Sequence, residues 1–151
     1  MKTRKILLAV LAVIVLIQFI RPEKNISATE SKNDIFLKYP ASDSVKSLIR
    51  TSCYDCHSNN TTYPWYTNIQ PIGLWMNHHV EEGKGELNFS EFLTYNPRKA
   101  DHKLDEATDE IKEGEMPITS YTLIHHNAKL LPEQRKEVIT WIQTTRKQII
   151  P

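Results

Sequence analysis

The sequence predicts an all-α domain. Apolar side chains recur at three- and four-residue spacing in the stretches 71–83, 97–114 and 131–145, which is the period of a helix that buries one face. No stretch shows the sustained alternation of apolar and polar residues that is typical of a half-buried strand. We therefore expect four or five helices joined by long loops.

The first two helices of the domain have recognisable ends. Ser42 or Asp43 can cap a helix that leads into Cys53, because a side-chain oxygen there accepts a hydrogen bond from a free backbone amide. Pro71 fits the first position of the second helix, and Gly83 its end.

The remaining helices follow from similar signals. Asn88, with Glu91 three residues later, resembles a capping box. Asn96 and the proline after it open a helix that Gly114 ends. The last helix begins at Leu131-Pro132-Glu133.

The cysteines carry the most informative pattern. The only two in 151 residues are Cys53 and Cys56, and His57 follows directly. C-x-x-C-H is the attachment signature of c-type haem. Each thiol can add to a haem vinyl group to form a thioether, and His57 is then placed to bind the iron from one side.

C-x-x-C has three other common uses in proteins. A structural zinc site needs four ligands, and the chain has no second cysteine pair. A thioredoxin-like redox pair is expected beside β-strands, which the sequence around Cys53 does not predict. A disulfide across two residues would close a very small loop and stabilise little. Haem attachment is the interpretation that the pattern favours.

The charge distribution argues against nucleic acid as a partner. Beyond residue 21 the chain has 15 basic and 18 acidic residues, a net charge of about −3 with neutral histidines. A nucleic-acid-binding domain is usually basic. The balance suits an acidic carrier that meets basic partners.

Residues 1–21 are typical of a signal peptide or signal anchor. Three basic residues precede an apolar run, 6–20, that is interrupted only by Gln18. Fifteen helical residues cover about 22 Å, less than the ~30 Å hydrocarbon core of a bilayer. Because Ile26-Ser27-Ala28 is a poor cleavage site, we favour an uncleaved anchor.

The rest of the chain divides into a linker, 22–33, and a haem-binding domain, 34–151. The positive charge before the apolar run predicts that the N-terminus stays on the cytoplasmic side of the membrane. We therefore expect the domain on the periplasmic side of the bacterial cytoplasmic membrane, either anchored or soluble after cleavage.

The second axial ligand of the iron must come from elsewhere in the chain. Met116 is our candidate, since it lies in a loop after a helix and Pro117 restricts the backbone there. A thioether ligand stabilises ferrous iron. The rivals are Met76 and His79, which share one helix face, and His78, His125 and His126. We expect His125 and His126 to lie in outer contacts or at the surface, and His102 to be solvated on a charged helix.

The loop after the motif is rich in aromatic side chains. Tyr63, Trp65 and Tyr66 can pack on a haem edge or bind a propionate. Ordinary packing within the loop explains them equally well.

These stretches together resemble a family of exported bacterial proteins, the haem-binding domain family, a branch of the cytochrome c-like proteins. The resemblance covers about residues 34–147 and implies one covalent haem c held by Cys53, Cys56 and His57. It is compatible with Met116 as the distal ligand. One departure is that His125 is followed by histidine where the family has proline. The matching segments are Cys53–Asn59, Thr62–Tyr66, Glu81–Gly83, Leu87–Ser90, Gly114–Pro117, Tyr121, His125 and Leu131–Trp141.

We expect a mono-haem cytochrome that transfers single electrons to or from a periplasmic or membrane redox protein. An enzyme is disfavoured because the sequence offers no further redox centre. The alternative is a haem-based ligand sensor or peroxidase-like enzyme with an open sixth position, and a third is a binding module without haem.

Overall fold

The computed structural model describes residues 2–150, and this part of the chain is helical and contains no strand. The all-α class expected from the sequence is confirmed. One isolated antiparallel bridge joins Ile26 to Asn60. The α-helices are α1 (Lys2–Ile17), α2 (Asp43–Ser52), α3 (Tyr54–His57), α4 (Ile72–Glu86), α5 (Pro97–Glu113), α6 (Thr119–Thr122) and α7 (Pro132–Ile149), and short 3₁₀ turns cover Ile35–Leu37, Trp65–Asn68, Phe89–Thr94 and His126–Ala128.

Several helix ends lie where the capping residues predict them. The Ser42 side chain accepts a hydrogen bond from the amide of Val45 at the start of α2. Asn96 does the same for Lys99 at the start of α5. Gly114 ends α5 with φ of 84°, a left-handed conformation that side chains with a Cβ rarely adopt.

Two expected boundaries and one expected capping box were wrong. Helix α4 continues past Gly83 to Glu86, because Gly83 serves close packing against α3 and does not end the helix. Pro71 precedes the first helical residue. Asn88 caps a 3₁₀ turn, and the Glu91 carboxylate does not close a capping box but accepts hydrogen bonds from other side chains, those of Ser31, Asn33 and Asn59.

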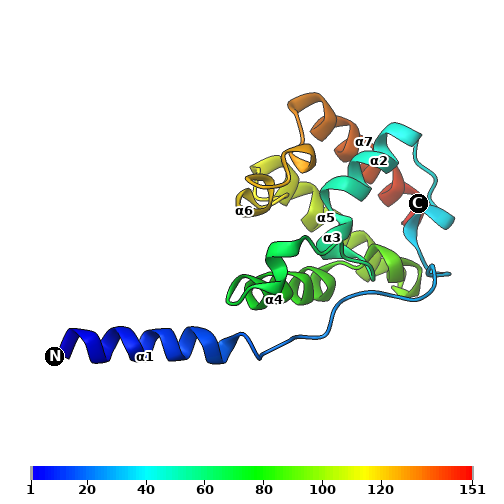
Figure 1. The fold of residues 1–151 in the computed structure, drawn as a ribbon. Helices are drawn as coiled ribbons and strands as arrows, with labels where there is room; N and C mark the ends of the chain where they lie inside the picture. Colours follow the sequence, from blue (N-terminus) through cyan, green and yellow to red (C-terminus); the bar gives the residue numbers. More distant parts are fainter. Residues whose placement is uncertain (1, 151) are drawn as a thin grey trace.

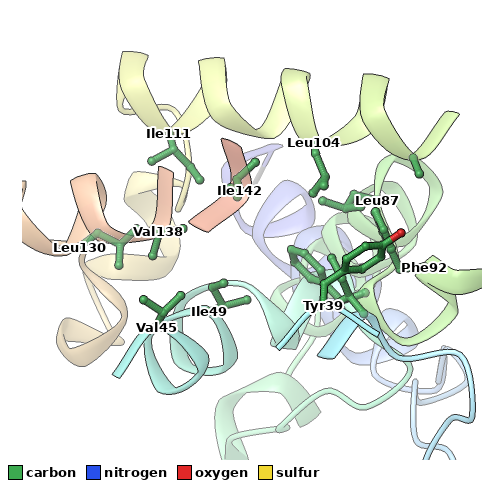
Figure 2. Packing of buried hydrophobic residues seen from close by; sticks show 13 residues of the cluster. Tyr39, Val45, Ile49, Leu87, Phe92, Leu104, Ile111, Leu130, Val138 and Ile142 are labelled. Atoms are coloured by element: carbon green, nitrogen blue, oxygen red, sulfur yellow. The ribbon is translucent and has the colours of Figure 1, made fainter. Parts of the chain in front are cut away.

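The core lies where α7 packs against α5 and α2. Figure 2 shows Leu104 and Ile111 pointing from α5 toward Ile142 of α7, with Ile49 of α2 below them. Leu104 is completely buried. At the edge of this contact Arg146 of α7 binds Asp101 of α5, with Nε 2.7 Å from Oδ1.

The N-terminal helix α1 extends away from the other helices (Figure 1). None of its side chains is buried. Within residues 2–150, no helix has the length and apolar character that are needed to cross a membrane.

The segment 22–33, expected as a linker, makes specific contacts with the domain. The Asn25 side chain donates hydrogen bonds to the Ser58 carbonyl and to the Thr61 hydroxyl, at 2.9 and 2.8 Å. The amide of Ser27 donates to the Asn59 carbonyl. This segment therefore runs along the loop that follows the cysteine motif.

We predict that Leu104→Ala lowers the free energy of unfolding by about 2–5 kcal/mol, because it leaves a cavity between α5 and its neighbours. Leu37→Ala is the matched control, since Leu37 is 65% exposed, and should change stability by less than about 0.5 kcal/mol. Urea unfolding followed by circular dichroism measures both. Equal losses in the two variants would contradict the assigned core.

Candidate functional site

The cysteine motif lies at the junction of α2 and α3. Cys53 and Cys56 are half-buried free thiols. Burial raises the pKa of Cys53 to about 12, with a further contribution from Cys56. Burial and the charge of Asp55 raise the pKa of Cys56 to about 11. Both thiols are therefore protonated at neutral pH, unlike a redox-active pair, whose thiol pKa is lowered.

The imidazole of His57 is held in one orientation. Its Nδ1 lies 2.9 Å from the carbonyl oxygen of Leu87, which can only accept, so Nδ1 carries the proton in this bond. Burial lowers the pKa of His57, while the Leu87 carbonyl partly opposes the shift. The ring is therefore neutral with a lone pair on Nε2, which is the form that binds a metal.

Two adjoining cavities, of about 370 and 410 Å³, flank the motif. The first is walled mainly by aliphatic side chains from the core, including Ile49, Leu87 and Ile142. The second is bounded by α3, α4 and the loop before α6. The residues that line both are Ser52, Cys53, His57, Glu86, Met116 and Pro117.

The side chains around the two cavities fit a haem. The walls are largely apolar, which suits the porphyrin, and the thiols and neutral imidazole sit together on one side. The hydroxyl of Ser52 is buried at the cavities without a hydrogen-bond partner among the described residues. A buried hydroxyl normally has a hydrogen-bond partner. The unpartnered Ser52 hydroxyl therefore indicates that a further group binds in this space.

Met116 lies in the lining of the same two cavities as His57. The turn before it is held by the carbonyl of Glu110, which accepts the amides of Gly114, Glu115 and Met116 at 3.0–3.2 Å. This turn brings the thioether of Met116 to the site, although Met116 is far from the cysteine motif in the sequence.

The rival ligands differ in position. His79 lines the second cavity, and its ring packs edge-on against Trp75 with centroids 4.4 Å apart. Met76 is absent from the lining of both cavities. His125 is engaged elsewhere, since its Nε2 lies 2.7 Å from the Tyr66 hydroxyl.

The other histidines are solvent-exposed. His78 and His102 lie 3.3 Å from Glu82 and Glu106, one turn further along α4 and α5. His126 is exposed in the 3₁₀ turn before α7.

The aromatic loop does not reach the cavities in this structure. The Tyr63 hydroxyl accepts the amide of Asn25 at 2.8 Å, Trp65 is 75% exposed, and Tyr66 binds His125. None of these three aromatic residues lines either cavity. Contact with haem and ordinary packing within the loop both stay predictions for these side chains.

Sequence reasoning missed a pair of residues that joins the motif to the Met116 loop. Asp55 accepts the amide of Thr62 at 3.0 Å and the hydroxyl of Tyr121 at 2.7 Å. Tyr121 lines the second cavity, and burial followed by Asp55 raises its pKa. Nothing in the one-dimensional pattern pairs residues 66 positions apart.

A family model described as a haem-binding domain matches residues 12–144. The matched range contains the motif, Met116 and every residue that lines the two cavities. No curated protein matches the chain, and no solved structure does.

We predict that Gly83→Ala disrupts the site while Gly85→Ala does not. A Cβ on Gly83 would lie 2.8 Å from the Cys56 carbonyl oxygen, whereas a Cβ on Gly85 meets no atom within 4 Å. Gly83→Ala should lower the free energy of unfolding by about 1–3 kcal/mol, because the added methyl group overpacks the contact. Gly85→Ala should leave the free energy of unfolding unchanged or raise it by up to about 1 kcal/mol, because alanine has the higher helix propensity. Urea unfolding of the haem-free chain measures the effect; matching values for the two variants would refute the close approach.

Proposed function

The chain belongs to the haem-binding domain family, and we propose that it is a mono-haem c-type cytochrome that transfers single electrons outside the cytoplasm. One observation carries the proposal. His57, Met116 and Cys53 line both adjoining cavities, and Cys56 lines the second. When bound, haem supplies the one-electron iron couple, and the protein sets its binding, orientation and electrostatic surroundings.

The cysteines would provide covalent attachment. Cys53 and Cys56 would hold the haem through thioether bonds to its two vinyl groups, and the addition of each S–H across a vinyl double bond would need no net oxidation. The raised pKa values of both thiols keep them protonated before attachment. His57 would bind the iron through Nε2, because the Leu87 carbonyl engages Nδ1.

Met116 is the proposed second axial ligand. A thioether is a soft ligand that favours ferrous iron and raises the reduction potential. With His57 and Met116 both bound, no position would remain open to a gas or peroxide. This arrangement favours an electron carrier over a sensor or peroxidase.

The proposed location is the periplasmic side of the cytoplasmic membrane. The basic residues before the apolar run 6–20 support export with the N-terminus inside. C-type haem is attached after export, so the address and the motif agree. The partner would be a membrane or periplasmic redox protein.

We predict that Met116→Ala removes the sulfur-to-iron charge-transfer band from the oxidised optical spectrum. The reduction potential should fall by on the order of 0.1 V or more, because axial ligands set haem potentials over a range of about 0.8 V. Met76→Ala is the control, since Met76 lines neither cavity, and should leave both readings unchanged. A spectrum that responds to Met76 or His79 instead would reassign the ligand.

Carbon monoxide tests the alternative function. The native ferrous protein should bind carbon monoxide slowly and Met116→Ala should bind it rapidly, because only the variant has an open position. Rapid binding by the native protein would reject the carrier in favour of a sensor or peroxidase-like enzyme.

A further inference from the structure

From Ile6 onward, helix α1 is apolar on all its sides. From Ile6 to Leu16 its large apolar side chains are between 48% and 65% exposed. A helix that is apolar all round needs apolar surroundings in every direction. A protein partner covers one face of such a helix, whereas lipid covers all of them.

The end of α1 is fastened to the domain. The Gln18 amide donates through Nε2 to the Gln70 carbonyl and accepts the Gln70 amide through Oε1, both at 3.0 Å. Gln70 is itself buried. Its side chain donates to the Ile20 carbonyl and accepts the amide of Leu74 in α4. The only polar residue within the apolar run is therefore used to attach α1 at the start of α4.

The segments that meet at the Gln18–Gln70 contact carry several exposed apolar side chains, and we call these the α1-side patch. They belong to the turn after α1, the segment 65–69 before α4 and the first turns of α4, which lies beside the end of α1 in Figure 1. The patch consists of Phe19 (80% exposed), Trp65 (75%), Ile69 (45%), Ile72 (42%) and Trp75 (49%).

The chemistry of the patch fits the interface of a bilayer. Trp65 and Trp75 are amphipathic aromatic residues, which concentrate at the level of the lipid headgroups. Arg21 lies beside them, with its guanidinium donating to the Asn68 carbonyl, and can meet lipid phosphate.

We infer that the α1-side patch docks on a lipid bilayer surface, so that the domain lies against the membrane and not at the end of a free tether. We choose lipid over a protein as the occupant because the patch is continuous with α1. The same bilayer can then cover both the patch and the apolar sides of α1. The patch can be buried at the bilayer surface even if α1 does not cross the whole bilayer.

The docked face borders the proposed haem site. Trp75 packs against His79, which lines the second cavity. Docking therefore turns the edge of that cavity toward the membrane, where a membrane redox partner would approach it. The docking itself does not depend on haem.

Photochemical labelling tests the inference on the full chain. The chain is reconstituted in vesicles of phosphatidylethanolamine and phosphatidylglycerol that contain a lipid with a diazirine next to the headgroup. After illumination, adducts are located by peptide mass spectrometry. We expect adducts on α1 and on residues 65–76, and none on the α7 segment 136–147, whose Trp141 serves as the aromatic control.

The results distinguish docking on lipid from contact with a second copy of the chain. Trp65→Ser with Trp75→Ser should lose the adducts on residues 65–76 and keep those on α1. Adducts confined to α1, or spread equally over α7, would overturn the inference. Hydrogen-exchange protection of residues 65–76 that rises with protein concentration and not with lipid would assign the patch to a second copy and also overturn it.

Discussion

The hydrogen bond between His57 Nδ1 and the Leu87 carbonyl is the constraint on which the site depends. It joins the ring of the motif to the residue that follows α4, and α4 must therefore run close to α3. Only a residue without a side chain allows this approach, because a Cβ on Gly83 would meet the backbone of Cys56. The direction of the imidazole, the length of α4 and the position of one glycine are consequences of a single contact.

Asp55 connects this half of the site to the other. It stands between the two cysteines and accepts hydrogen bonds from the amide of Thr62 and the hydroxyl of Tyr121. Tyr121 lies five residues after Met116, so the pair holds the Met116 loop against the motif. A hydrogen bond to a carboxylate is stronger than one between neutral groups, which suits a loop with little helix of its own.

The domain has apolar interiors of two kinds. On one side α2, α5 and α7 pack aliphatic side chains against one another, and on the other the cavities lie between those helices, α3 and α4. A haem in these cavities would complete the core with its own apolar surface. This explains how a domain with few long helices encloses enough apolar area to be stable.

The sequence by itself determined the helical class, the helix caps at Ser42, Asn96 and Gly114, and the C-x-x-C-H motif from which haem attachment is proposed, because these depend on neighbours a few positions apart. It misplaced the end of α4 at Gly83, since a glycine that ends a helix and one that admits a close neighbour are alike in one dimension. The tertiary structure alone decided which residues meet: His57 with Leu87, Asp55 with Tyr121, Gln18 with Gln70, and Met116 with the motif. These pairs are separated by 30 to 66 positions, and only the packing of the helices brings them together.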